Sequence, residues 1–107
     1  SRYGQIHTVA TFVEQHYAEP IRLSNLVAMT GMSTTVFKKV FAEVFQMPPG
    51  KYLTTIRLNA VRKLLEETDK LLSDVAAETG FFDQSHLTRI FKKERGLTPG
   101  EYRRCHR

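Results

Sequence analysis

Residues 72–102 read LSDVAAETGFFDQSHLTRIFKKERGLTPGEY, a pattern that predicts two helices joined by a turn. The first helix should end at Gly80, because glycine favours the left-handed conformation that closes a helix. In the second helix Leu87, Ile90 and Phe91 share one apolar face. A short helix, a turn and a helix with a polar exposed face form the layout of a helix-turn-helix. The side chains expected on that exposed face are Gln84, Ser85, Thr88, Arg89 and Lys92.

The same layout occurs a second time, earlier in the chain. A shift of 49 residues aligns residues 23–31 with residues 72–80, and after one inserted residue a shift of 50 aligns residues 39–52 with residues 89–102. Turns and core positions match together, which indicates a duplicated structural unit. Duplication for stability alone would match the cores, but it would not require two similar polar faces. The exposed face of the first copy is Thr35, Lys38, Lys39 and Ala42.

The periodicity elsewhere predicts an all-α fold with seven helices. Apolar residues spaced i, i+3, i+4 and i+7 indicate a first helix over residues 5–18, ended by Pro20. A longer helix over residues 50–67 has two apolar stripes, so we expect it to pack on two sides and to connect the copies. The expected organisation is one domain over 1–107, with a first subdomain at about 5–49, a connector helix at about 50–67 and a second subdomain at about 70–107.

Helix starts are expected at residues whose side chains cap the first free amides. Ser24 and Ser73 should cap the two short helices, and Asp83 should cap the sixth helix. The bulky, apolar Phe82 occupies the turn just before Asp83, where we expect it to be partly exposed.

The bulk composition narrows the function classes. A chain of 107 residues with net charge +5 and an isoelectric point near 9.6 favours an anionic partner such as nucleic acid or an anionic membrane surface. Its one cysteine, Cys105, allows neither an internal disulfide nor a thiolate zinc site, which predicts a reducing, cytoplasmic setting. We expect no metal, no cofactor and no membrane contact. The start at Ser1, not Met, indicates a domain cut from a longer protein.

Three segments resemble the DNA-binding domain of the AraC/XylS family of bacterial transcription regulators. They are LSNLVAMTGMS at 23–33, RLNAVRKLL at 57–65 and VAAETGFFDQSHLTRIFKKERGLTPGEYR at 75–103. The pattern GF..QSH..R.FK....TP..YR carries most of the resemblance, which covers about residues 23–103. It implies a homeodomain-like fold with two helix-turn-helix subdomains that binds double-stranded DNA to regulate transcription. It further implies RNA polymerase as a partner. Family members often have a separate effector-sensing or dimerisation domain, while some consist of this domain alone.

Donor geometry assigns roles on the exposed faces. Arg89 can bond guanine bidentately and Gln84 can bond adenine, whereas Lys39, aligned with Arg89, is less directional. Ser24 and Ser73 lie at the expected N-termini of short helices, and helix N-termini favour anions such as phosphate. The expected base contacts are Thr35, Lys38, Lys39, Gln84, Ser85, Thr88 and Arg89, and the expected phosphate contacts are Ser24, Thr34, Ser73, Lys92 and Lys93.

The resemblance leaves two features of DNA binding to be settled. Two units on one connector should place their reading helices roughly 34 Å apart, in successive major grooves of a bipartite site. A connector that does not fit straight DNA would require bending at about 1 to 6 kcal/mol, or looser engagement of one unit. The family usually has a small polar residue at Phe82, and Glu43 in the first copy would repel a phosphate.

Two other function classes are alternatives to DNA binding. Some DNA-repair methyl-transfer proteins resemble this family, but they need an activated thiol, and Cys105 stands alone in the terminal segment RRCHR. No paired carboxylates, phosphate loop or nucleophile-base set is present, so we expect no enzyme activity. A module that contacts RNA polymerase is the second alternative, and a steep salt dependence of duplex binding would distinguish it. His86 is expected to pack or form hydrogen bonds.

Overall fold

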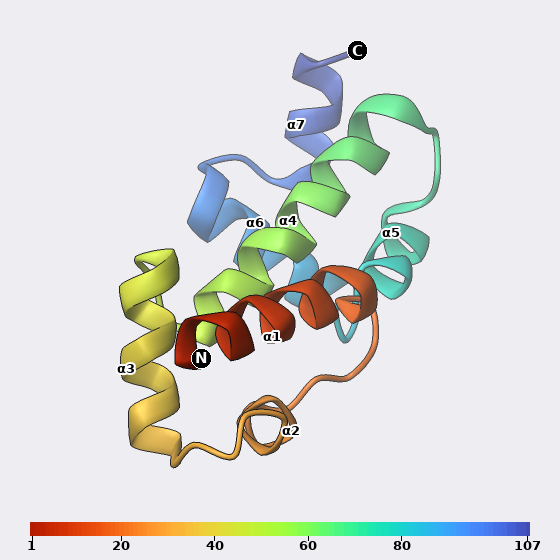
Figure 1. Ribbon diagram of the computed structural model, residues 1–107. Coiled ribbons are helices and arrows are strands. Elements are labelled where there is room, and N and C mark those ends of the chain that lie inside the picture. Colours follow the sequence, from red (N-terminus) through yellow and green to blue (C-terminus); the bar gives the residue numbers. More distant parts are fainter. The chain divides into compact units, whose positions relative to one another are not determined.

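The computed structural model describes residues 1–107, which form seven α-helices and no strand, as the sequence predicts. The chain divides into two compact units, called here the first unit, Ser1–Ile56, and the second unit, Arg57–Arg107. Helix α4 begins in the first unit and ends in the second (Figure 1). The helices are α1 (Arg2–His16), α2 (Leu23–Ala28), α3 (Thr34–Phe45), α4 (Pro49–Glu67), α5 (Leu72–Glu78), α6 (Gln84–Arg95) and α7 (Pro99–Cys105).

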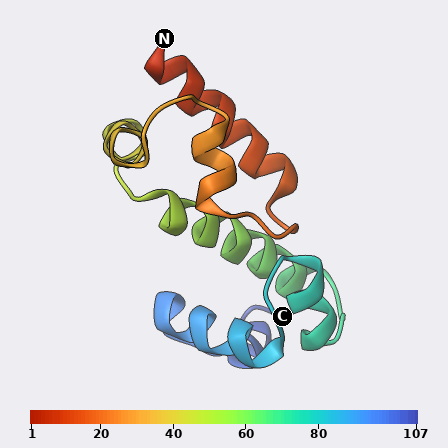
Figure 2. The ribbon, with the colours of Figure 1, turned by 90° about the horizontal axis from the view of Figure 1, so that it is seen from below.

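The first unit encloses a core built by α1, α2 and α3. Helices α2 and α3 cross steeply, as the two views in Figures 1 and 2 show, and α1 contacts α3. Tyr52, Leu53 and Ile56 of α4 pack against this core. Burial of each large apolar side chain stabilises the unit by about 1.5 to 3 kcal/mol. The buried core residues are Ile6, Val9, Val13, Leu26, Phe37, Val40 and Phe41.

The second unit builds its own core around the other half of α4. Helix α5 contacts α6, and α6 contacts α7. Leu53, Ile56, Ala60 and Leu64 recur at the helical spacing that places them in one apolar stripe of α4. Leu64 nevertheless packs against this second core. The predicted stripe that contains Leu53 and Leu64 therefore contributes to both cores, whereas the other stripe, Leu58, Val61 and Leu65, belongs to the second core. The buried core residues are Leu58, Val61, Leu65, Val75, Ala76, Phe81, Leu87 and Phe91.

The duplication includes the first helix, which the sequence comparison did not reveal. A shift of 52 residues aligns the α1 core residues Ile6, Val9 and Val13 with Leu58, Val61 and Leu65 of α4. Each unit therefore has three helices of the helix-turn-helix type, with α1 in the first unit equivalent to the second half of α4 in the second unit.

An aromatic pair with a carboxylate partner recurs in both units. Tyr52 lies edge-on to Phe41 with ring centroids 5.3 Å apart, and the Tyr52 hydroxyl donates to Glu14 at 3.1 Å. In the second unit Tyr102 lies 5.5 Å from Phe91, also edge-on. Its hydroxyl donates to Glu66, which the shift of 52 residues aligns with Glu14.

These contacts change the ionisation of the groups involved. Burial, followed by the nearby Glu14 carboxylate, raises the pKa of the Tyr52 hydroxyl. Burial followed by Glu66 raises the pKa of the Tyr102 hydroxyl. The hydrogen bond from Tyr102, followed by that from Arg62, lowers the pKa of Glu66. Both tyrosines therefore remain neutral donors at physiological pH.

The ends of α3 and α6 are stabilised in parallel ways. The Ser33 side chain accepts a hydrogen bond from the Val36 amide at 3.2 Å, and Asp83 accepts from the His86 amide at 2.7 Å, so the predicted Asp83 cap is confirmed. Both helices end in the left-handed conformation, at Gln46 with φ of 60° and at Gly96 with φ of 82°.

The predicted N-caps at Ser24 and Ser73 are wrong. The α2 cap is Arg22, whose amide donates to the Asn25 side chain at 3.3 Å, so Ser24 is the second helical residue. In α5 the cap is Leu71, without a side-chain hydrogen bond. Packing explains both starts, because the first helical residues, Leu23 and Leu72, lie against the cores.

Two further features complete the fold. Helix α1 begins at Arg2, three residues before the predicted start, because the Ser1 hydroxyl caps it by accepting from the Gly4 amide at 3.1 Å. None of the seven helices combines the length and the apolar character that crossing a bilayer would require.

Candidate nucleic-acid interface

The exposed face of α6 carries most of the residues predicted to contact DNA. Gln84 and Ser85 are its first two residues, and Arg89 follows one turn later; all three are exposed. Thr88 is half-buried and thus less exposed than the sequence pattern predicts. Lys92 and Lys93 are exposed in the last turn.

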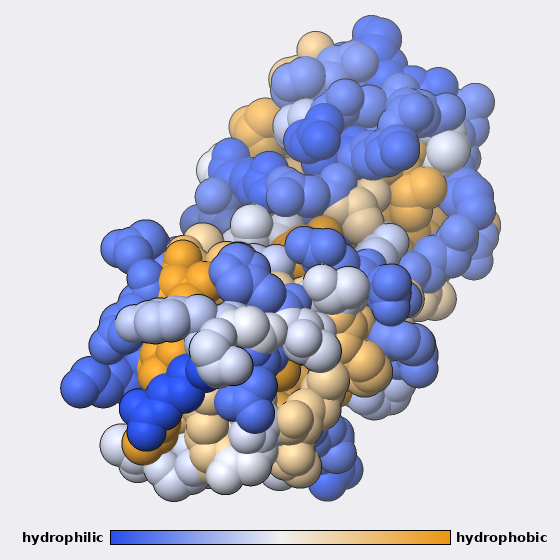
Figure 3. All heavy atoms as spheres, in the orientation of Figure 1, coloured by the Kyte–Doolittle hydropathy of each residue, from blue (hydrophilic) through white to orange (hydrophobic).

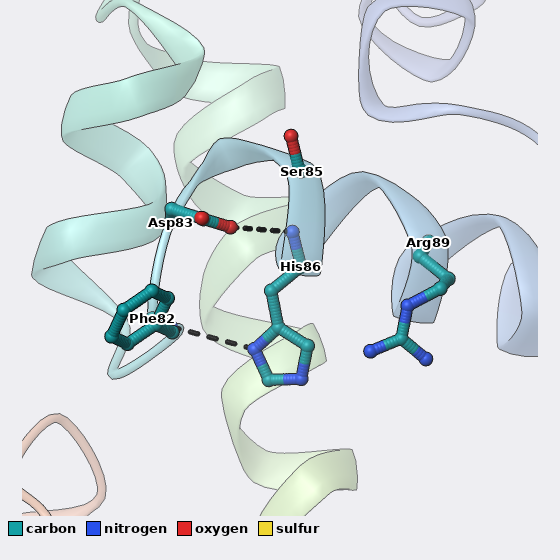
Figure 4. A pocket seen from close by; sticks show the side chains of 5 residues that line it. All are labelled: Phe82, Asp83, Ser85, His86 and Arg89. Carbon is teal, nitrogen blue, oxygen red and sulfur yellow. Dashed lines mark hydrogen bonds between the residues drawn. The ribbon is translucent and has the colours of Figure 1, made fainter.

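An open hollow of about 500 Å³ lies at the start of α6 (Figure 4). The rings of Phe82 and His86 and the guanidinium of Arg89 lie on the same side of the helix start in that view. Two predicted base contacts, Ser85 and Arg89, therefore meet in one surface feature, whereas Gln84 and Thr88 do not line it. The complete lining is Phe82, Asp83, Ser85, His86 and Arg89.

His86 fixes the turn before α6, in agreement with its expected packing role. Its ring lies edge-on to the buried Phe81 with centroids 5.5 Å apart. The Phe82 amide donates to His86 Nδ1 at 3.4 Å, a long hydrogen bond. Acceptance at Nδ1 places the imidazole proton on Nε2 in the neutral ring.

Contacts within the second unit hold α6 in place. Arg95, in the last turn of α6, donates from Nη2 to the Asn59 side chain of α4 at 2.9 Å. Arg103 of α7 donates to the Leu65 carbonyl at 3.3 Å and to the Lys70 carbonyl at 2.7 Å. These two arginines, which the sequence analysis did not single out as structural, connect α6 to the middle of α4, and α7 to the end of α4 and the loop after it.

A reciprocal cap begins α7, directly after α6. The Thr98 amide donates to Glu101 Oε1 at 2.9 Å, and the Glu101 amide donates to Thr98 Oγ1 at 3.1 Å. The hydrogen bonds from Thr98 lower the pKa of the Glu101 carboxyl. The carboxylate is thus matched to the positive end of the helix.

The first unit presents the equivalent face on α3. Thr34 and Thr35 are its first two residues, and Lys38 and Lys39 follow in the next turn; all four are exposed. Glu43, also exposed, accepts a hydrogen bond from the Tyr3 hydroxyl at 3.4 Å. This bond engages the carboxylate that sequence analysis identified as unfavourable near phosphate.

The cations at the centre of these faces are available for a partner. The structure contains no hydrogen bond or ion pair for the side chains of Lys38, Lys39 or Arg89. Most of the visible surface around α7 is hydrophilic, whereas apolar patches show between polar side chains over α1 to α3 (Figure 3). Exposed, uncompensated cations are suited to an anionic ligand.

Comparison with known proteins decides the family. The family described as "Helix-turn-helix domain" matches residues 26–105. A crystal structure of the DNA-binding domain of the global transcriptional factor AdpA, in complex with a target DNA, superposes with a TM-score of 0.91 and 27% identity over 95% of this chain and 92% of that one. The chain belongs to the AraC-type helix-turn-helix family of DNA-binding domains.

The curated relatives of this AraC-type domain are longer proteins. The uncharacterized HTH-type transcriptional regulator YbfI of Bacillus subtilis is 40% identical over 78% of this chain and 30% of its own length. The HTH-type transcriptional regulator ExsA of Pseudomonas aeruginosa is 31% identical over 92% of this chain and 35% of its own length. The chain thus spans about a third of these relatives, and its family is one of transcription regulator domains, not enzymes.

Sequence patterns did not assign every residue of this AraC-type interface. Phe82 and His86 line the hollow but were absent from the predicted contact set. The sequence feature that could have identified this part of the site is Phe82 itself, because a large apolar residue at an exposed turn is unusual. Ser24 and Ser73 lie in the first turns of α2 and α5 with exposed hydroxyls, separate from the α3 and α6 faces in sequence.

Proposed function

We propose that this AraC-type domain binds a specific bipartite sequence of double-stranded DNA, with α3 and α6 in successive major grooves, as part of a transcription regulator. One observation carries the proposal: two units with equivalent cores and caps each expose a polar, basic face on the equivalent helix. A recognition helix docks with its N-terminal residues toward the base edges. The single domain over 1–107 would act through α4 as connector.

In the second unit, α6 would supply the sharper base readout. The unpaired guanidinium of Arg89 can donate two parallel hydrogen bonds to guanine O6 and N7, and Gln84 can bond adenine N6 and N7. Ser85 and Thr88 can donate to bases or phosphates, although Thr88 is half-buried. In the first unit, Thr35, Lys38 and Lys39 occupy the equivalent turns of α3.

Phosphate contacts would set the register of the domain. Exposed Lys92 and Lys93 in the last turn of α6 and Thr34 in the first turn of α3 are the proposed donors on the reading helices. Ser24 and Ser73 are exposed residues in the first turns of α2 and α5, where the first backbone amides of a helix have no acceptor within the helix. Such contacts add affinity without sequence preference.

The full-length protein would add further parts. Since the chain spans about a third of its curated relatives, a separate effector-sensing or dimerisation domain would occupy part of the remaining length. RNA polymerase is the proposed protein partner of the regulator, which would act in the cytoplasm on chromosomal DNA.

A selection of bound duplexes from a random pool tests the proposal directly. We expect two short specified elements separated by about one helical turn, and binding that weakens steeply as salt rises. Insertion of five base pairs between the elements should reduce binding to that of one element, because it rotates one half-site to the other side of the duplex. If the selection yielded no preferred sequence, or a single short element, this result would contradict the proposal that both units recognise bases.

A phosphate variant gives the matched control for that experiment. Lys93→Ala should weaken binding to every duplex about equally and reduce the salt slope by about one. Arg89→Ala should change the selected sequence itself. A domain that contacts only RNA polymerase would show neither response, and its duplex binding would be weak at all salt concentrations.

A further inference from the structure

One aromatic side chain on this domain is exposed far beyond the others. Phe82 is 90% exposed, more than Leu71, Tyr3 or Met29, the other large exposed apolar residues. A phenyl ring in water lacks the hydrophobic stabilisation that burial would provide. Neither core of the protein uses this ring.

The duplication identifies Phe82 as an added residue. The turn before α3 has Met32 between Gly31 and Ser33, whereas the turn before α6 has both Phe81 and Phe82 between glycine and N-cap. Met32 packs against the first core, and Phe81 is buried in the second, so Met32 and Phe81 are equivalent. Phe82 has no counterpart in the first unit.

The main chain on both sides of Phe82 is fixed. Phe81 anchors it in the core on one side, and on the other Asp83 caps α6 through the His86 amide at 2.7 Å. The Phe82 amide itself donates to His86 Nδ1. The ring therefore projects from an ordered turn and lines the hollow that also contains Ser85 and Arg89 (Figure 4).

We propose that Phe82 is a specificity-determining residue that places its ring against the C5-methyl group of a thymine in the major groove, beside the base contacted by Arg89. The inference rests on the proposed DNA-binding function. The thymine methyl is the one apolar group on the major-groove edge of the bases, and apolar side chains contact it. A ring at the N-terminal end of a recognition helix lies at the end that meets base edges.

The composition of the hollow favours DNA over a protein as the occupant. Its other side chains are Asp83, whose carboxylate is engaged as the cap, and Ser85, His86 and Arg89, which are donors for bases or phosphates. A protein-binding hot spot would require a surrounding apolar or desolvated rim. Apart from Phe82, every residue that lines the hollow is polar.

Replacement of thymine by deoxyuridine removes the methyl group and nothing else, so it tests the contact. On a duplex selected by the unaltered domain, each thymine is replaced in turn and the dissociation constant is measured. We expect one position at which the loss weakens binding about fourfold, the equivalent of about 0.8 kcal/mol for one methylene-sized group. Phe82→Ala should bind the thymine duplex about fourfold more weakly and should not respond to that replacement.

Two further variants serve as controls. Phe82→Leu keeps an apolar contact and should retain part of the methyl dependence. Leu71→Ala removes another exposed apolar side chain of the second unit, 69% exposed, and should bind and select like the unaltered domain. Thermal unfolding of Phe82→Ala should match that of the parent, because the ring lies outside the core.

Each other outcome overturns the inference. Equal affinity of Phe82→Ala and the parent on all duplexes would show that the ring faces a protein or solvent. An equal loss on thymine and deoxyuridine duplexes at every position would show DNA contact without methyl readout. If Arg89→Ala still alters the selected sequence in these cases, the proposed function stands; if the parent selects no sequence, both fail.

Discussion

The Phe41–Tyr52 pair of the first unit and the Phe91–Tyr102 pair of the second have nearly the same geometry, with ring planes at 77° and 76°. The reading faces beside them differ. The α3 face contains Lys39 where α6 has Arg89. The two copies thus share the side chains that hold the helices in place and differ in the side chains proposed to contact DNA.

Each unit has a hollow on its surface, and the two hollows lie at different places along the equivalent helices α3 and α6. In the second unit the hollow lies at the start of α6, beside the added Phe82. In the first unit a hollow of about 390 Å³ lies farther along the recognition helix, between Lys38 and Ala42 of α3 and the start of α4. At the position of Ala42 the second unit has Lys92, a longer side chain. One scaffold therefore presents two distinct surfaces.

The largest expected effect tests whether the cores are equivalent. Phe41→Ala and Phe91→Ala should each cost about 3 to 5 kcal/mol of unfolding free energy, because both rings are fully buried. Phe82→Ala is the matched control and should change stability little. Chemical denaturation measures all three variants. A much smaller loss at one of the two core positions would show that the units are not equivalent in packing.

The next effect concerns discrimination by the two faces. Arg89→Ala should cost about 1 to 3 kcal/mol at a specific site and relax preference at one base pair, and Lys39→Ala should do so in the other half-site. Lys39→Arg should sharpen preference there, because the guanidinium donates bidentately. Selection from random duplexes measures each change. If Lys39→Ala weakened all sequences alike, Lys39 would be a phosphate contact.

A smaller effect concerns the ends of the two recognition helices. Gly96 and Gln46 both have positive φ, and a side chain added at Gly96 would meet no atom within 4 Å. Gly96→Gln should therefore cost about 1 kcal/mol through backbone strain alone. Gln46→Gly should gain less, because it removes the 2.8 Å hydrogen bond from Gln46 to the Glu43 carbonyl. Thermal melting measures the stability of both variants. A loss at Gly96→Gln equal in size to the gain at Gln46→Gly would contradict this account.

The smallest effect is a dependence of stability on pH. The pKa values of Glu66 and Glu101 are below the ordinary value of 4.5 because of hydrogen bonds from Tyr102 and Thr98. A carboxyl group with a lowered native pKa stabilises the fold above its unfolded pKa, and this stabilisation is lost as pH falls through the native value.

Glutamine variants measure that dependence. The loss of melting temperature caused by Glu66→Gln or Glu101→Gln should be present at pH 6 and should shrink as the pH falls below about 4.5. Glu67→Gln, an exposed change on α4, is the control. A difference between parent and variant that stays constant from pH 6 to pH 3 would contradict the assignment.

Sequence patterns predicted the fold because apolar spacing and turn residues act locally. They identified the seven helices, the Asp83 cap and the exposed position of Phe82. They misplaced the starts of α2 and α5, because burial of Leu23 and Leu72 outweighs the capping preference of Ser24 and Ser73. Competition between packing and capping depends on tertiary contacts, which local patterns do not contain.

The sequence analysis also missed the first helix of the duplicated unit. Helix α1 and the end of α4 share no run of identical residues, and the equivalence of Glu14 and Glu66 became visible only through their tyrosine partners. In the interface, the pattern indicated which faces carry donors but not which donors share a hollow. Only the three-dimensional structure shows that Phe82 and His86 line this hollow.

The two phenylalanine–tyrosine pairs provide a spectroscopic signal of tertiary packing. The protein has no tryptophan, so its near-ultraviolet circular dichroism comes from tyrosine and phenylalanine held in fixed surroundings. Tyr52 and Tyr102 are each packed within a different unit. Replacement of Tyr102, the one tyrosine of the second unit, by phenylalanine leaves the tyrosine signal to Tyr3, Tyr17 and Tyr52 of the first unit. The difference between the spectra of the parent and of this variant would follow the loss of tertiary packing in the second unit, without any attached dye.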